Sequence, residues 1–372
     1  MKKNYLLLLI CTLFFSFTNA IAKIGTGSIK IKTNMPIGQS ISLDMLVYSG
    51  LDAEGEVKDD YPIFNENFSV DGASYVTSRG MKVMITPKTP EFIIYGDVDY
   101  LSIVGQEIVG VDVSKATELH ELRINENPIT SIDVSEVPKL KVFWASYCHA
   151  LSSVNMEHAH QLTCISLQGT KIASIDLNNK PYITNLHLGE NPNLRSIDIT
   201  KLPELEELWV NGNGMEALDI SQNPLLLHLE CSKNNLTKLD VTNNEKLEFL
   251  SCWGNKINGE TMDNLITSLV QESGETEREF CVYNRLYAYE KNLLSTEQAK
   301  TVKERGWLPK QAIGSIAFFT WEDYDGETIS GIEIPATIHK NNAVWYDLNG
   351  RKIAKPISKG IYIHKGKKIM IK

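Results

Sequence analysis

A three-residue pattern, an aspartate between two apolar residues, recurs through the middle of the chain at a nearly constant interval. It occurs at Val111-Asp112-Val113, Ile132-Asp133-Val134, Ile175-Asp176-Leu177, Ile197-Asp198-Ile199, Leu218-Asp219-Ile220 and Leu239-Asp240-Val241. Val154-Asn155-Met156 fills the one gap, so that the central residues are always 21 or 22 positions apart. A fixed period of this length predicts a solenoid, in which each repeat packs against its neighbours.

A second pattern, L-x-x-L-x-L-x-x-N, runs between these tripeptides in eight copies. The copies begin at Val98, Leu119, Leu140, Leu162, Ile183, Leu205, Leu226 and Leu247. Each copy predicts one short strand, and stacking the copies at about 4.8 Å gives a parallel sheet over a continuous core. The ninth position holds Asn127, Asn191, Asn213, Asn234 and Asn255, whose side chains are expected to bond the backbone of the neighbouring turn. Gln106, Cys148 and Thr170 interrupt this series, which predicts less regular turns there.

The two patterns together resemble the leucine-rich repeat, in the short bacterial form of internalin-like and Bacteroidetes secreted proteins. The resemblance covers about residues 92–310. It implies a mainly β protein with some α: about eight repeats, a β-rich N-terminal cap, a helical C-terminal cap and a small β tail. It also implies non-catalytic recognition of a protein partner through the concave face.

The flanking sequences divide the rest of the chain. We expect a signal peptide at 1–22, a β-rich cap or small domain at 23–91, repeats at 92–258, a helix–strand–helix cap at 259–310, a linker at 311–334 and a basic β tail at 335–372. Ser295 and Gln298 form a predicted capping box for the second helix of the cap. The mature chain is then expected to begin near Lys23 and to be exported, extracellular or on the outer cell surface, without a transmembrane segment.

Charge is distributed unevenly between the body and the tail. The whole chain carries −9, but residues 340–372 hold nine Lys or Arg against one acid, a net +8. Residues 23–339 hold 26 bases against 45 acids, a net −19, which argues against nucleic acid as a partner. The tail, through YDLNGRK and KGIYI, resembles the C-terminal sorting or attachment segments of exported Bacteroidetes proteins. A small β module with a solvated basic face is the alternative.

The outward positions of the repeat strands carry the candidate binding residues. The fifth position and its flanks place aromatic and basic side chains on the concave face, including three of the six tryptophans of the chain. Such residues are enriched at binding hot spots. The candidates are Tyr100, Arg123, Trp144, Tyr147, His187, Trp209, His228, Phe249 and Trp253. A carbohydrate ligand for the aromatic rings and a purely structural spacer are the alternatives, and the rings could instead simply cover the sheet or meet the N-terminal cap.

Catalytic and cofactor chemistry find little support in the sequence. No G-x-S-x-G, H-E-x-x-H, phosphate-binding or dinucleotide-binding motif occurs, so we expect no enzyme activity, no cofactor and no metal. The aspartates of the tripeptides could form a metal array, but Asp-x-Ser and Asp-x-Thr spacings favour hydrogen bonds within each turn. Cys231 and Cys252 occupy inward positions of adjacent repeats, where buried free thiols are favoured over a disulfide.

Overall fold

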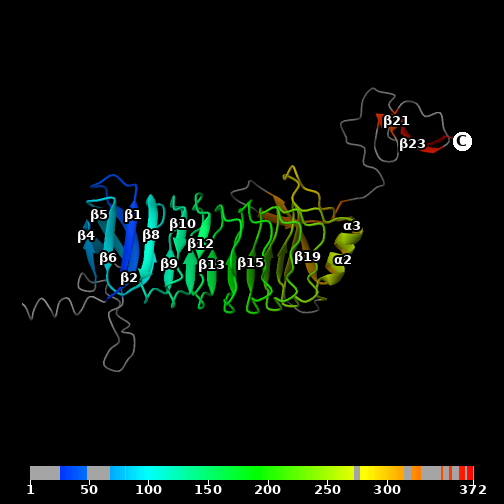
Figure 1. Ribbon diagram of the computed structural model, residues 1–372. Helices are drawn as coiled ribbons and strands as arrows, with labels where there is room; N and C mark the ends of the chain where they lie inside the picture. Colours follow the sequence, from blue (N-terminus) through cyan, green and yellow to red (C-terminus); the bar gives the residue numbers. More distant parts are fainter. Residues whose placement is uncertain are drawn as a thin grey trace, which may run out of the picture.

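The computed structural model describes residues 26–47, 68–79, 81–271, 277–313 and 320–327, together with four strand segments between residues 345 and 371. The signal peptide expected at 1–22 lies outside these residues. The described body is a long array of short strands that follow one another in sequence order, from the β-rich N-terminal end to two helices at the C-terminal end (Figure 1).

Ten consecutive parallel strands form the centre of a 14-stranded sheet. They are β7 (Val98–Ser102), β9 (Glu121–Arg123), β11 (Val142–Trp144), β13 (Cys164–Ser166), β14 (Asn185–His187), β15 (Glu207–Trp209), β16 (His228–Glu230), β17 (Phe249–Ser251), β18 (Arg278–Tyr283) and β19 (Trp307–Ile313). The first eight contain the predicted repeat strands, so the leucine-rich-repeat solenoid is confirmed. Equivalent positions of neighbouring repeats lie in register, as Leu186, Leu208 and Leu229 do.

The N-terminal end is a cap of two layers that shares strands with the first repeat. The layers contain β1 (Ser28–Thr33), β2 (Ile41–Val47), β3 (Ser69–Asp71), β4 (Ala73–Arg79), β5 (Lys82–Pro87), β6 (Glu91–Tyr95) and β8 (Ile108–Lys115). Strands β2, β5 and β4 extend the long sheet beyond β7, whereas the order β3-β6-β1-β8 makes a separate four-stranded sheet. The first tripeptide, Val111-Asp112-Val113, therefore belongs to a cap strand that pairs with β1. The Oε1 atom of Gln106 accepts the backbone N–H of Ser42 at 3.0 Å, which links the first turn to the cap.

The C-terminal end continues the sheet instead of ending it with helices alone. Helix α2 (Glu260–Ser268) precedes β18, and α3 (Thr296–Glu304) precedes β19. The capping box is present: Ser295 Oγ accepts the Gln298 backbone N–H, and the Gln298 side chain accepts the N–H of Ser295. Strand β20 (Thr320–Asp323) pairs antiparallel with β19 at the edge of the sheet. The linker expected from residue 311 therefore differs from the structure, because β19 runs to Ile313 and β20 adds a strand.

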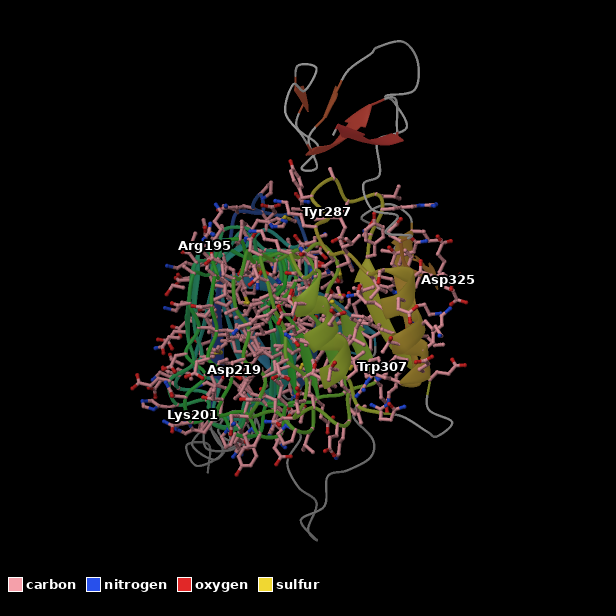
Figure 2. All side chains as sticks on the ribbon, turned by 90° about the vertical axis from the view of Figure 1, so that its right-hand side faces the viewer. Arg195, Lys201, Asp219, Tyr287, Trp307 and Asp325 are labelled. Atoms are coloured by element: carbon pink, nitrogen blue, oxygen red, sulfur yellow. The ribbon has the colours of Figure 1, made fainter. Side chains whose placement is uncertain are left out.

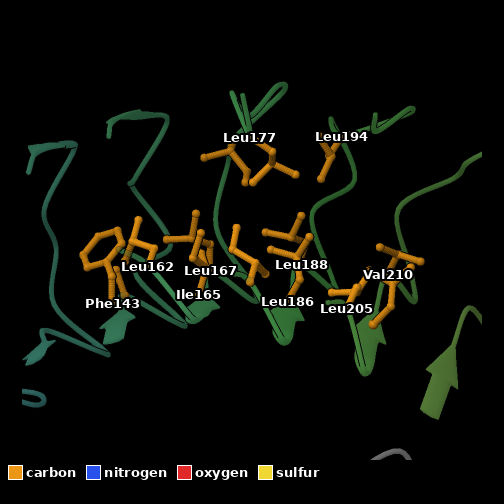
Figure 3. Packing of buried hydrophobic residues seen from close by; sticks show 14 of the residues in the cluster. Phe143, Leu162, Ile165, Leu167, Leu177, Leu186, Leu188, Leu194, Leu205 and Val210 are labelled. Atoms are coloured by element: carbon orange, nitrogen blue, oxygen red, sulfur yellow. The ribbon is translucent and has the colours of Figure 1, made fainter. Parts of the chain in front are cut away.

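The inward side chains form one continuous apolar core along the solenoid. Phe143, Ile165, Leu186 and Leu208 are fully buried at the middle inward position of successive strands. Turn residues such as Leu177 close the core from the opposite side (Figure 3). Each strand is only three residues long in most repeats, so this shared layer, and not the single repeat, supplies the hydrophobic stabilisation.

Buried asparagine side chains connect successive turns after the strands. Asn213 is a representative case: its Oδ1 accepts the Asn191 N–H at 2.8 Å, and its Nδ2 donates to the Leu188 carbonyl at 3.0 Å. Cys148 and Thr170 make related bonds, since the Cys148 thiol donates to the Ile124 carbonyl and the Thr170 hydroxyl to Asn191 Oδ1.

The residue just before each ladder position adopts the same left-handed backbone conformation in all eight turns. These residues are Gly105, Glu126, Tyr147, Gly169, Glu190, Gly212, Lys233 and Gly254, with φ between 51° and 70°. The turns at Gln106, Cys148 and Thr170 share this conformation, so their backbone is as regular as that of the asparagine turns, and the predicted irregularity is confined to their side-chain hydrogen bonds. The small thiol and hydroxyl reach the same carbonyls that an asparagine amide reaches.

The aspartates of the tripeptides accept hydrogen bonds within their own turns, as expected. Asp219 Oδ1 accepts the Ser221 N–H at 3.0 Å, and Asp198 accepts both the N–H and the hydroxyl of Thr200. The Ser221 backbone N–H holds the pKa of Asp219 below its usual range, and the Thr200 hydroxyl does the same for Asp198. Cys231 and Cys252 are buried with free thiols, and burial raises their pKa well above the usual value.

The tail contains four short strands where strands were expected. They are β21 (Trp345–Tyr346), β22 (Lys352–Ile353), β23 (Gly360–His364) and β24 (Lys367–Ile371), in one antiparallel sheet of order β22-β21-β23-β24. The turn residues at 349–350 and 365–366 lie outside the described residues. Within the described part of the chain, no helix has the length and apolar character needed to cross a bilayer.

Candidate functional site

A groove of about 1110 Å³ lies on the outward face of the C-terminal repeats. Strands β15 to β17 supply its floor, the turns after the repeat strands supply one rim, and β20 supplies Trp321 to its lining. Its lining includes Tyr147, His149, Glu190, Glu207, Trp209, Asn211, His228, Glu230, Lys233, Phe249, Trp253 and Trp321. Predicted binding residues from separate repeats are thus brought together in one place.

Trp209 lies at the centre of the floor. The register of the sheet places His187 on one side of it and Glu230 on the other, because the three residues pair across β14, β15 and β16. The His187 ring stacks on the indole at 4.5 Å between centroids, with an angle of 23°. Burial lowers the pKa of His187 although Glu207 lies 3.4 Å away, so the stacked ring is neutral near pH 7. The indole itself remains 36% exposed.

An aromatic wall stands beside this floor. The Phe249 ring meets His228 edge-on at 6.2 Å and meets Trp321 edge-on at the same centroid distance. Trp321 comes from β20, beyond the repeats, and was not among the predicted residues. No sequence period points to it, because the strand that carries it runs antiparallel to the repeat strands.

Three left-handed residues form the rim: Tyr147, Glu190 and Lys233. The Lys233 Nζ donates to Glu190 Oε1 at 3.2 Å. The equivalent position in the next repeat is a glycine in both cases: Gly169 one repeat after Tyr147, and Gly212 one repeat after Glu190. A Cβ at Gly169 would lie 2.8 Å from the Tyr147 ring, and one at Gly212 would lie 3.0 Å from the Glu190 carboxyl carbon. The glycines therefore give the long side chains room to lie along the rim.

Trp253 differs from its predicted role as an exposed ring. It is only 2% exposed, because the Tyr287 ring meets it edge-on at 5.4 Å and the Lys233 ammonium lies 5.4 Å from its centroid. Tyr287 belongs to the loop after β18 and lies near the upper edge of the body in Figure 2, away from Asp219. The prediction treated position 253 as outward, which is correct for the strand period but ignores this loop.

The loop after β18 is fastened by one carboxylate. Glu290 accepts backbone N–H groups of Gly254, Asn284, Lys291 and Asn292 at 2.8–3.0 Å. Burial raises the pKa of Glu290 to about 7, against the opposing effect of these donors. Leu286 and Tyr289 of the same loop are exposed.

The predicted residues of the N-terminal repeats do not reach the groove, with the exception of Tyr147. The Arg123 guanidinium lies 4.0 Å from the Trp144 ring centroid and 5.8 Å from that of Tyr100, and it forms an ion pair with Glu121. The Trp144 Nε1 donates to Cys164 Sγ at 3.2 Å. In this half the two rings lie on the sheet with Arg123 between them.

The groove has the composition of a recognition site. It combines aromatic surface with three carboxylates, two lysines and the amide of Asn211, whose Oδ1 is buried without a hydrogen-bond partner. Such a mixture of apolar walls with a few placed polar groups is typical of ligand sites. No group of three or more His, Cys, Asp or Glu side chains suited to a metal occurs in the described residues.

Comparison with known proteins gives only distant similarities. No protein-family model and no curated protein matches the chain. Among solved structures, the functional domain of InlJ from Listeria monocytogenes, described as including a cysteine ladder, is 22% identical over 59% of this chain, with a TM-score of 0.44. The chain spans half the length of that domain. An internalin, InlF, from Listeria monocytogenes strain 4b F2365 is 16% identical over 57% of this chain and 79% of its own, with a TM-score of 0.31. Neither similarity is close enough to assign a function to this chain.

Proposed function

We propose that the chain is a non-catalytic recognition protein that binds a protein partner through its concave face, with the groove around Trp209 as the anchoring site. Trp209, His228, Phe249 and Trp321 offer aromatic surface, and the lysine and carboxylates of the rim and floor offer polar contacts. Interface hot spots combine these features in one desolvated pocket surrounded by a polar rim.

The observation that carries the proposal is the placement of strained residues. A left-handed conformation costs a non-glycine residue about 1–2 kcal/mol, and such strain tends to gather at functional sites. Four of the eight turns use glycine at this position, so the scaffold itself accepts glycine there. Three of the four exceptions, Tyr147, Glu190 and Lys233, line the groove, and Glu126 does not. The turn conformation alone therefore does not require these three side chains.

The test replaces each strained residue by the glycine that the neighbouring turns already use. A photo-crosslinking amino acid at position 249 would first capture the partner for identification and purification. Tyr147→Gly, Glu190→Gly and Lys233→Gly are each expected to leave the free energy of unfolding unchanged or to raise it by up to about 1 kcal/mol. Each is also expected to weaken partner binding about 10-fold, measured by calorimetry, whereas Glu126→Gly leaves binding unchanged.

Two results would contradict the proposal. In the first, the three groove variants bind the partner as the parent chain does, which is the behaviour of a structural spacer. In the second, Glu126→Gly weakens binding as much as they do, which places the contact outside the groove. Tyr182→Ala supplies a further control, because Tyr182 is an exposed aromatic residue that does not line the groove.

Carbohydrate binding is the second candidate function. It is favoured by the confinement of the groove to a few repeats, where the partly exposed Trp209 lines the same space as the side chain of Asn211. A sugar ring can stack on an indole while its hydroxyls bond amide and carboxylate oxygens. Glycan-array binding that Trp209→Ala abolishes, together with no captured protein, would establish this alternative in place of the first.

The proposed location is outside the cell, through removal of residues 1–22 and with the tail as a sorting or attachment segment. N-terminal sequencing of the secreted protein is expected to begin near Lys23. Deletion of residues 335–372 is expected to change where the chain accumulates, whereas a chain with an intact tail reaches the medium or the outer surface. Unchanged distribution after deletion would leave the tail as an ordinary β module.

A further inference from the structure

The three carboxylates of the groove are not equally paired. Glu190 forms an ion pair with Lys233, with 3.2 Å between Oε1 and Nζ. Glu207 accepts Asn185 Nδ2 at 2.6 Å and lies 3.4 Å from His187 Nε2. Glu230 accepts the backbone N–H of Ser232 at 3.0 Å, and no ion pair within 4 Å joins it to any residue that the structure describes. It is the one carboxylate of the three without a cation or imidazole beside it.

The environment of Glu230 makes the lack of a cation costly, although hydrogen bonds from Ser232 offset part of that cost. Its side chain is half-buried on the floor, and the nearest charge that acts on it belongs to Lys233, which Glu190 already holds. Burial raises the pKa of Glu230 above the usual value. A carboxylate taken partly out of water is stabilised when a cation joins it, and the groove leaves it accessible from outside.

The N-terminal repeats show the same chemistry with the cation present. There the Arg123 guanidinium lies over the Trp144 ring and forms an ion pair with Glu121, two residues before it on β9. On the groove floor, His187 occupies the position relative to Trp209 that Arg123 occupies relative to Trp144. Glu207 lies two residues before Trp209 on the same strand, and Glu230 lies beside Trp209 on the next strand. The indole and the carboxylates are in place, but no arginine accompanies them.

Trp209 is partly exposed in the groove, which Glu230 also lines. His187 stacks on the indole from β14, and Glu230 flanks it from β16, on the opposite side. Phe249 and Trp321 close the groove beyond. This space is bordered by an aromatic ring, a carboxylate and an aromatic wall, which suits a planar cation. A guanidinium stacks on indole and forms a forked pair with a carboxylate, whereas an ammonium does only the second well.

We propose that the groove receives an arginine side chain of the protein partner, stacked on Trp209 and paired with Glu230. The partner thereby supplies the residue that Arg123 supplies internally in the N-terminal repeats. This inference rests on the proposed function, since it specifies the chemistry of the same site. The acidic body of the chain, at −19 over residues 23–339, favours the approach of a basic partner segment.

The test uses the full mature chain with ¹⁵N-labelled tryptophan and the peptide acetyl-Gly-Arg-Gly-amide as probe. Comparison with Trp209→Phe assigns the indole signal of Trp209. The peptide is expected to shift that signal saturably, with a dissociation constant on the order of 1 mM, as suits one cation–π contact and one ion pair. The same peptide with citrulline, the neutral isostere, is expected to bind about 10-fold more weakly. Glu230→Gln, which keeps the side-chain volume and an acceptor for Ser232, is expected to show the same loss.

A matched variant controls for effects of charge alone. Glu121→Gln removes a carboxylate of the same sheet that is paired with Arg123 outside the groove, and it should leave the peptide affinity unchanged. Equal affinity for the citrulline peptide, or full affinity in Glu230→Gln, overturns the arginine assignment. So does a shift of the Trp209 signal by chitotriose but not by the peptide, which indicates a sugar site. A shift caused by deletion of residues 335–372 without any peptide indicates that the basic tail of the chain itself fills the groove, and also overturns it.

Binding of the captured protein partner to the Trp209 and Glu230 variants distinguishes failure of this inference from failure of the proposed function. If Trp209→Ala abolishes partner binding while Glu230→Gln preserves it, protein recognition stands and the arginine assignment falls. If neither variant affects partner binding, the groove is not the recognition site and both fall. Loss in both variants, together with the peptide result, supports the arginine assignment.

Discussion

The two halves of the concave face are built on the same strands but differ in how their outward side chains are satisfied. In the N-terminal half, Arg123 lies over both Tyr100 and Trp144, and the indole N–H of Trp144 is bonded to Cys164. In the C-terminal half, Trp209 is stacked on one side only, and Glu230 forms no ion pair within the described chain. Inside the sheet the two halves are alike, since Leu122 and Leu208 are both fully buried at the same position.

This difference shows that an aromatic residue at an outward position does not by itself mark a binding site. Trp144 and Trp209 occupy the same column of the repeat, yet only Trp209 lines the groove. The two tryptophans differ in whether neighbouring residues already contact the ring and form ion pairs with the charged side chains beside it. The comparison can be tested at four levels, beginning with the interior that the halves share.

The largest effect is expected from the core. Leu122→Ala and Leu208→Ala each remove a fully buried side chain from the same layer, so each should lower the free energy of unfolding by about 2–5 kcal/mol. Urea unfolding measured by circular dichroism gives both values. A large inequality between the two would show that the halves differ in their cores as well as in their outer faces.

The turns should show a smaller and unequal effect. Asn213→Ala leaves the Asn191 N–H and the Leu188 carbonyl without their buried partner and should cost about 1–3 kcal/mol. Cys148→Ala removes a single weak thiol donor in the N-terminal half and should cost less, because a thiol contributes mainly as a small apolar group. Equal losses in urea unfolding would contradict the view that the asparagine amides carry this part of the stability.

Substitution of Trp209 should affect partner binding, whereas substitution of Trp144 should affect the free energy of unfolding. Trp209→Ala is expected to weaken partner binding at least 10-fold, or about 1.4 kcal/mol, with little change in unfolding. Trp144→Ala should leave binding unchanged and cost about 0.5–2 kcal/mol of stability through the lost contact with Arg123. Calorimetry with the purified partner and urea unfolding provide the two measurements. If Trp144→Ala also weakens binding, the recognition surface extends over both halves.

The smallest expected effect is on the pH dependence of stability. Hydrogen bonds lower the pKa of Asp112, Asp176, Asp198, Asp219 and Asp240, which are spread over both halves. Their contribution is present above the unfolded pKa of about 3.9 and is lost as the pH falls through the lower folded values. Stability should therefore decline below about pH 4.

The raised pKa values of Glu230 and Glu290 act in the opposite direction and only in the C-terminal half. A carboxyl group whose folded pKa is raised is costly to ionise in the folded state. Stability should therefore fall as the pH rises from about 4.5 through about 7, the pKa of Glu290. Urea midpoints between pH 3 and pH 9 should show both declines. Glu290→Gln should flatten the upper one and Asp219→Asn should weaken the lower one; an upper decline that persists in Glu290→Gln would exclude Glu290 as its main cause.

Much of the scaffold could be predicted because its determinants are local. The period of the tripeptides and the alternation within each strand placed Phe143, Leu186 and Leu208 inside and Trp144 and Trp209 outside. The left-handed column was also readable, since glycine occupies four of its eight positions at the repeat spacing. It was missed because the other four positions hold Glu, Tyr and Lys, which conceal the shared conformation.

The ends of the sheet and the full outline of the groove could not be read from the period. Strands β18 and β19 continue the stack, but helices α2 and α3 and their connections interrupt the spacing before each. Trp321 reaches Phe249 from a strand of opposite direction, and Tyr287 covers Trp253 from a loop with no repeat pattern. These contacts join residues far apart in sequence, and no pattern of one repeat encodes them.

The sequence by itself determined the solenoid, its period, and which side chains face inward or outward. The physical reason is that each short strand can bury its apolar side only against the next copy of itself, so a repeated local pattern is sufficient. Only the tertiary structure decided which outward residues are already covered or paired by other side chains of the chain. Arg123 settles on Trp144, Tyr287 covers Trp253, and Trp209 and Glu230 remain accessible in the groove, because those outcomes depend on neighbours that the repeat does not specify.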